Sequence, residues 1–245
     1  MYGGGKVRRK TRIKLMFFVT VILTITAILC IMDIKDELYL MVMNKTDIFQ
    51  PEIIIDAGHG GADGGAVSSN GVAEADINLS ISEKTQFVAS FLGINAKMTR
   101  TGRDSLDFEP YATIRKNKMN DLKARVKIAE ENEEAEYISI HLNKFSDPRY
   151  FGAQVFHKND DASILLAQNI QGALYQLNDK NTRSFKQIPN DNYIFDRISN
   201  TGIIVECGFL SNEEEELILQ NDVYQSKIAM LIAGGYTNYK YKGDV

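Results

Sequence analysis

Hydrophobic and polar positions divide the chain into an apolar run near the N-terminus and a longer part with mixed periodicities. Residues 15–32 form an 18-residue run without a charged side chain. Because a helix of about 20 mostly apolar residues crosses a bilayer, this run predicts a transmembrane helix. The residues before it carry six basic side chains and no acidic one: Lys6, Arg8, Arg9, Lys10, Arg12 and Lys14. The positive-inside rule therefore places residues 1–14 in the cytoplasm and the chain after residue 32 outside it.

A cleaved signal peptide is the alternative interpretation of the same run. No A-x-A pattern follows it, and Leu29 is too bulky for the position before a lipoprotein cysteine at Cys30. These features favour an uncleaved membrane anchor, with residues 33–50 as a short tether to an extracytoplasmic domain.

Beyond residue 50, short β-type runs alternate with segments of helical periodicity. The alternation predicts one α/β domain over residues 51–241, with a mixed, largely parallel twisted sheet and helices on both faces. Strands are expected at residues 53–55, 95–99, 137–140, 153–157 and 203–205, and helices at 76–92, 122–131, 162–177 and 222–239. The four glutamates at 213–216 suit the first turn of a further helix, where we expect them to be solvated.

The charge of the chain and its two cysteines limit which partners it can bind and which side chains could form a metal site. The net charge is −4, and the first 14 residues contribute +6, which leaves −10 on the remainder. An acidic domain argues against nucleic acid as the partner. Cys30 and Cys207 are too far apart for metal-type spacing and indicate no disulfide framework, so a metal site would use histidines and carboxylates.

Three polar residues that could form a functional site lie at the ends of predicted strands. His59 lies in a glycine-rich turn after the first strand, His141 ends the strand at 137–140, and Glu206 follows Val205. In open α/β sheets, sites form beyond the carboxyl ends of the strands. These side chains are therefore candidates for a common site, although each also has an ordinary explanation as a solvated or satisfied strand-end residue.

Glu74 lies at the start of the helix that follows the glycine-rich turn. Two imidazoles and one carboxylate are a common set of zinc ligands in hydrolases, and they leave the fourth coordination position to a water molecule. Zinc lowers the pKa of that water to about 7. Glu206 would accept the proton of that water. One alternative is that the glycine-rich turn binds phosphate, although no Lys-Ser/Thr follows it as in a P-loop. Another is that Glu74 is only an acid in the first turn of a helix, with no role in binding a metal. We expect the third histidine, His157, at the surface.

Four segments carry a resemblance to a known family. Residues 56–61 are similar to a D-P-G-H-G-G motif with Ala57 in place of proline, Glu74 follows at the expected spacing, residues 139–141 read S-I-H, and residues 206–212 match E-x-G-F-L-S-N. The chain thus resembles the zinc-dependent N-acetylmuramoyl-L-alanine amidases of the amidase-3 type from about residue 53 to 239. The resemblance implies that His59, Glu74 and His141 bind Zn²⁺ and that Glu206 is catalytic.

The resemblance also implies a biological role. It is greatest to a sporulation member of the family, which implies removal of stem peptides from peptidoglycan in the spore cortex, so that muramic-δ-lactam can form before germination. No long insertion supplies an autoinhibitory helix, so an activating partner protein is one expected form of regulation. A non-catalytic cell-wall binding module and a zinc peptidase or deacetylase acting on peptidoglycan are the alternatives.

Overall fold

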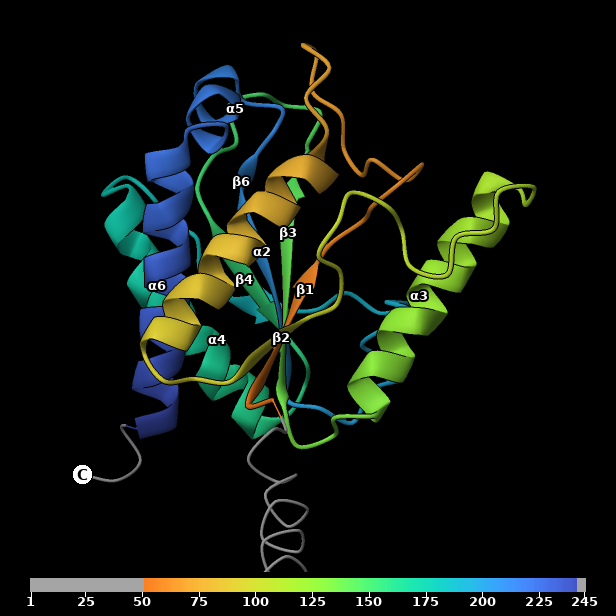
Figure 1. Ribbon diagram of the computed structural model, residues 1–245. Helices are drawn as coiled ribbons and strands as arrows, with labels where there is room; N and C mark the ends of the chain where they lie inside the picture. Colours follow the sequence, from red (N-terminus) through yellow and green to blue (C-terminus); the bar gives the residue numbers. More distant parts are fainter. Residues whose placement is uncertain (1–50, 242–245) are drawn as a thin grey trace, which may run out of the picture. The chain divides into compact units, whose positions relative to one another are not determined.

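The computed structural model describes residues 51–241, in which strands and helices alternate (Figure 1). The basic flank, the transmembrane helix and the tether predicted at residues 1–50 lie outside the described residues. Within residues 51–241, no helix has both the length and the apolar character needed to cross a membrane. In chain order the elements are β1 (Ile53–Ala57), α2 (Glu74–Phe91), β2 (Ala96–Met98), α3 (Ile114–Glu130), β3 (Glu136–Asn143), β4 (Gln154–His157), α4 (Asp161–Leu174), the 3₁₀ turn η2 (Tyr175–Leu177), β5 (Lys186–Gln187), β6 (Gly202–Phe209), α5 (Glu213–Leu219) and α6 (Asp222–Tyr241).

The strands form one sheet in the order β2-β1-β3-β6-β4-β5. The pairs β1–β2, β1–β3 and β3–β6 are parallel, β4 is antiparallel to β6, and β5 is parallel to β4. The predicted mixed α/β sheet is therefore confirmed. Because β1, β3 and β6 are parallel neighbours, their carboxyl ends meet at one edge of the sheet, which is where polar groups from three strands can come together.

One face of the sheet is apolar and is covered by three helices. Side chains alternate between the two faces along a strand, and the alternate residues of β1, β3 and β6 that face this side are buried hydrophobics. They pack with residues of α2, α4 and α6 in the main core, which includes Ile55, Ile140, Val205, Leu166 and Ile232. Figure 1 shows these three helices together on one side of the sheet.

The opposite face carries the polar residues. Here α3 and the segment at residues 188–198 cover a smaller apolar cluster that includes Ile54, Tyr137, Val126 and Phe195. Asp56, Ser139, His141 and Glu206 occupy the alternate strand positions on this same face, nearer the carboxyl ends. The prediction that helices cover both faces of the sheet is confirmed. The apolar cluster on this face is the smaller one, so the end of the face that carries the polar residues is less enclosed.

The long loop after β1 caps α2 without a side-chain cap. Ala73 precedes the helix and offers no side-chain hydrogen bond. Instead, the backbone N–H groups of Glu74 and Ala75 donate to the carbonyls of Ala66 and Gly64, which satisfies two of the unpaired donors of the first turn. The glutamate side chain at the helix start therefore stays free for other contacts.

Two expectations about charged or polar residues are wrong. A helix does begin at Glu213, capped by Asn212, but Glu215 and Glu216 are buried, not solvated. Glu215 accepts hydrogen bonds from the backbone of Gly152 and Phe209, and Glu216 accepts them from Ser68 and Asn70. Ser68, Asn70 and Gly152 lie far away in sequence, so the run of four acids did not reveal these contacts.

His157 is also buried, not at the surface. Its Nδ1 lies 2.7 Å from the carbonyl oxygen of Lys158, and its ring lies 5.8 Å from the ring of Phe185. The helix expected at 122–131 begins earlier, at Ile114, after the cap that Thr113 provides to the N–H of Lys116. Polar residues fill these added turns, so apolar periodicity alone placed the start too late.

Asp56 and Arg125 form the principal buried ion pair between the sheet and α3. Both side chains are almost fully buried, and the guanidinium also bonds Asp121 and the carbonyls of Ala57 and His59. We expect Arg125→Met to lower the free energy of unfolding by about 3–5 kcal/mol, because it leaves a buried carboxylate without its partner.

Urea unfolding followed by circular dichroism measures this loss. Lys127→Met, in the same helix, is the matched control, since Lys127 is exposed and lies 3.8 Å from Glu131. Its loss should stay below about 0.5 kcal/mol. Equal losses in the two variants would contradict the importance of the buried pair.

Candidate metal centre

His59 lies in the turn that follows β1, in an unusual backbone conformation. Its φ angle is +61°, a left-handed value that is uncommon for residues with a side chain. Two buried arginines hold the turn by its carbonyls: Arg100 bonds those of Ala57 and Gly58, and Arg125 bonds those of Ala57 and His59. The strain at His59 is thus stabilised by surrounding contacts, which is a common feature of functional sites.

His141 comes from the carboxyl end of β3, next to the same turn. A side-chain carbon placed on Gly58 would overlap its imidazole ring. Only glycine therefore allows the turn to approach the ring this closely. The ring centroids of His59 and His141 are 5.0 Å apart.

Glu74 connects the two histidines from the first turn of α2. Its Oε1 lies 2.9 Å from Nδ1 of His141 and 3.4 Å from Nε2 of His59. Oε1 also accepts from the N–H of Leu142, and Oε2 accepts from the N–H of Ala66. Burial would raise the pKa of Glu74, but the hydrogen bonds and charges of His141 and His59 outweigh it and hold the pKa well below its usual range. The group is therefore a carboxylate.

The three ligand atoms fit a small divalent cation. One atom from each of His59, Glu74 and His141 lies within 4.8 Å of the others. Zinc bonds of about 2.0–2.1 Å at tetrahedral angles place ligand atoms about 3.3 Å apart, close to the observed 2.9 and 3.4 Å. The structure thus brings together the three predicted metal ligands.

Glu206 lies on β6 directly opposite His141 of β3. Its Oε2 is buried and has no hydrogen-bond partner in the described part of the chain. Burial is the main cause that raises the pKa of Glu206 to about 7, and the charge of Glu74 acts in the same direction while the two histidines oppose it. A cation held by the neighbouring ligands would lower this pKa, because it favours the carboxylate.

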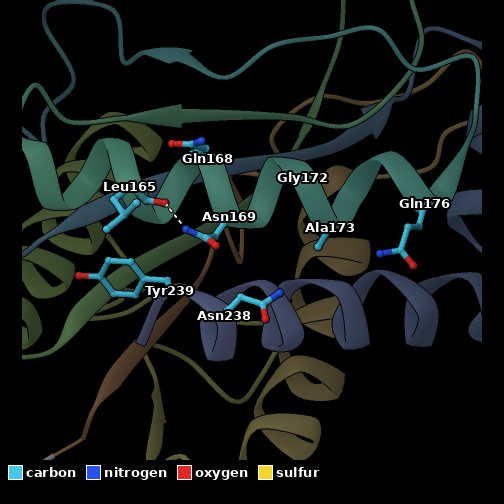
Figure 2. Close-up of a pocket in the computed structure, with 8 residues that line it drawn as sticks. All are labelled: Leu165, Gln168, Asn169, Gly172, Ala173, Gln176, Asn238 and Tyr239. Carbon is cyan, nitrogen blue, oxygen red and sulfur yellow. Dashed lines mark hydrogen bonds between the residues drawn. The ribbon is translucent and has the colours of Figure 1, made fainter. Parts of the chain in front are cut away.

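A cavity of about 240 Å³ opens beside these residues. It is lined by the strand-end residues and by α3 and the segment at 191–194: Asp56, Gly58, His59, Asp63, Lys118, Asp121, Leu122, Arg125, His141, Asp191, Asn192, Tyr193 and Ile194. A larger hollow of about 550 Å³ lies between α4 and α6, where Figure 2 shows mainly amide side chains such as Gln168, Asn169 and Asn238. No acid, base, histidine or cysteine lines that hollow, so it lacks the groups for hydrolysis.

Two neighbours of the ligands escaped the prediction from sequence. Asn78 donates to Glu74 Oε1 from one turn further along α2, at the i,i+4 spacing that brings helical side chains together. Asp63 lies four residues after His59, and its Oδ2 is 3.1 Å from Nδ1 of that histidine. The sequence feature that could have indicated Asp63 is its position four residues after His59 in a glycine-rich turn.

Comparison with known proteins identifies the family. Residues 53–238 match the family described as N-acetylmuramoyl-L-alanine amidase. The chain is 34% identical over 194 residues to the germination-specific N-acetylmuramoyl-L-alanine amidase of Bacillus subtilis. That alignment covers 78% of this chain and 81% of the relative. It is 27% identical over 232 residues to the amidase AmiA of Escherichia coli, covering 76% of this chain and 75% of that protein.

A solved structure gives the same result. The CwlD amidase from Clostridioides difficile, solved in complex with the GerS lipoprotein, superposes with a TM-score of 0.73 at 37% identity, over 76% of this chain and 96% of that one. The matched region contains all four site residues and nearly the whole described domain. The protein therefore belongs to the N-acetylmuramoyl-L-alanine amidase family and is an amidase of this class.

Proposed function

We propose that this amidase is a zinc enzyme that hydrolyses the amide between the lactyl group of N-acetylmuramic acid and L-alanine in peptidoglycan. The observation that carries the proposal is the convergence of two imidazole nitrogens on Glu74 Oε1, beside the unpaired oxygen of Glu206. Three protein ligands with an open fourth position are typical of catalytic zinc, whereas structural sites are closed by four.

His59, Glu74 and His141 would hold the metal through Nε2, Oε1 and Nδ1. When bound, zinc supplies a Lewis acid for the carbonyl oxygen and a water of lowered pKa. Glu206 takes the proton from the attacking water through its free carboxylate oxygen. The new C–O bond forms as the water attacks. Glu206 then returns the proton to the nitrogen of L-alanine, and the amide C–N bond breaks to release the amine.

We propose a place for this reaction in the spore cortex. The support is the identity to a relative named as germination-specific. Removal of stem peptides there leaves the lactyl carboxylate free, which is the precursor state for muramic-δ-lactam. The predicted anchor at residues 15–32 would hold the domain on the extracytoplasmic side of the membrane, and the solved relative in complex with a lipoprotein supports an activating partner of similar kind.

The role of Glu206 is tested by Glu206→Gln. We expect peptide release to fall at least about 100-fold, because an amide cannot accept the proton, while bound zinc stays near one per chain. Glu214→Gln removes an exposed carboxylate on α5 and should leave the rate unchanged. Measurement of free peptide together with metal analysis decides the matter, and undiminished release in Glu206→Gln would refute the assignment.

The metal assignment is tested by thermal unfolding with and without Zn²⁺. Zinc at 100 times its dissociation constant stabilises the folded state by about 2.7 kcal/mol, which raises Tm by about 5–10 °C in a domain of this size. His141→Ala should lose this shift. His157→Ala should keep it whatever its own Tm, because His157 is not among the proposed ligands, and a shift retained in His141→Ala would count against the site.

The bond cleaved is tested by mass spectrometry of digested peptidoglycan. We expect free stem peptides that begin with L-alanine and glycan strands with free lactyl groups, formed only with Zn²⁺ present. Candidate lipoprotein partners should be added in parallel, since higher turnover with one of them would support the proposed activator. Products that retain the lactyl–alanine bond would point to a peptidase or deacetylase, and peptidoglycan bound but uncut would point to a binding module.

A further inference from the structure

Asp63 has an unusually constrained carboxylate next to the proposed metal ligands. The backbone of Gly60 and Asp63 exchanges two hydrogen bonds, which closes a tight turn after His59. Within this turn, Asp63 Oδ1 accepts from the N–H of Gly65 at 3.3 Å. Its Oδ2 lies 3.1 Å from His59 Nδ1 and 2.9 Å from Nζ of Lys118, which reaches over from α3. The carboxylate is therefore fixed from three directions.

The two nitrogens of the His59 ring have different neighbours. Nδ1 is directed at Asp63, whereas Nε2 is directed at Glu74 Oε1. An ionised carboxylate can only accept a hydrogen bond, and both nitrogens face one. A metal bound beside Glu74 would need the lone pair of Nε2, so the ring proton would then lie on Nδ1, where Asp63 accepts it. Nε2 lies on the side of the other two proposed ligands. His141 differs, because its Nδ1 is directed at Glu74 and, in residues 51–241, its Nε2 has no hydrogen-bond partner.

We propose that Asp63 is a positioning residue that fixes the tautomer and orientation of His59 for metal binding. The inference rests on the proposed function, since it assumes that His59 Nε2 is a ligand. Carboxylates that accept from the second nitrogen of a metal-binding histidine strengthen the ligand and hold its ring, and their loss typically costs 10–100-fold in metal affinity. Lys118 holds the Asp63 carboxylate toward His59 from the neighbouring helix.

Zinc affinity of the full chain, measured by competition with a chromogenic chelator, tests the proposal. We expect Asp63→Ala and Asp63→Asn each to weaken zinc binding 10–100-fold. Asp76→Asn is the matched control: it removes the same charge from an exposed residue near Glu74 that pairs with Arg103, and its affinity should stay within about threefold of wild type. Equal losses in all three variants would mean that only the local negative charge matters, and would overturn the proposal.

A second readout does not depend on the metal. The ¹⁵N shifts of the His59 ring in metal-free protein report which nitrogen carries the proton. At a pH where the ring is neutral, we expect a larger Nε2–H population in Asp63→Ala than in wild type, because Glu74 still accepts from Nε2 while Nδ1 has lost its acceptor. A merely structural Asp63 would lower Tm in its variants but leave the tautomer and the zinc affinity as they are.

The outcomes separate this inference from the function on which it rests. Wild-type protein that binds no zinc would refute the proposed metal site, and the role of Asp63 with it. Wild-type protein that binds zinc, with unchanged affinity in both Asp63 variants, would overturn only the role of Asp63.

Discussion

The buried ion pair between Asp56 and Arg125 is the contact on which the rest of the site depends. Asp56 is the penultimate residue of β1, and Arg125 comes from α3, the helix that covers the polar face of the sheet. Removing one partner would leave a buried charge uncompensated, which costs several kcal/mol. The same guanidinium bonds the carbonyls of Ala57 and His59. The contact that attaches α3 therefore also sets the path of the turn that carries His59.

This arrangement determines which groups can face a cation. Arg100 and Arg125 together donate to the carbonyls of residues 57–59, so these oxygens are already hydrogen-bonded. Two cations near a metal site would by themselves weaken metal binding. Asp56 and Asp121 neutralise Arg125 directly, which leaves the negative charge of Glu74 available to the metal. Arg125 thus holds the backbone of the turn while two carboxylates offset its charge.

The sequence predicted those features that arise from local pattern and strand order. Strand-end positions placed His59, His141 and Glu206 at one edge because parallel neighbours share that edge, and helical periodicity placed Glu74 close to the start of α2. Features set by distant contacts were missed. Glu215 and Glu216 are buried because partners from other loops bond them, and Asp63 reaches His59 only because the turn closes on itself. Hydropathy cannot reveal such pairings, since burial of a charge depends on its partner.

Glu206 differs from the buried glutamates Glu74, Glu215 and Glu216 in the hydrogen bonding of its carboxylate oxygens. Both oxygens of Glu74, Glu215 and Glu216 accept hydrogen bonds from the protein. Among the residues that the structure describes, Glu206 is the one whose carboxylate has a buried oxygen without a partner. An unsatisfied buried acceptor costs about 1–3 kcal/mol. The proposed role of Glu206 is to take up a proton and give it back, which requires a free oxygen and a pKa near neutrality. Glu206 has the free oxygen, and burial raises its pKa to about 7.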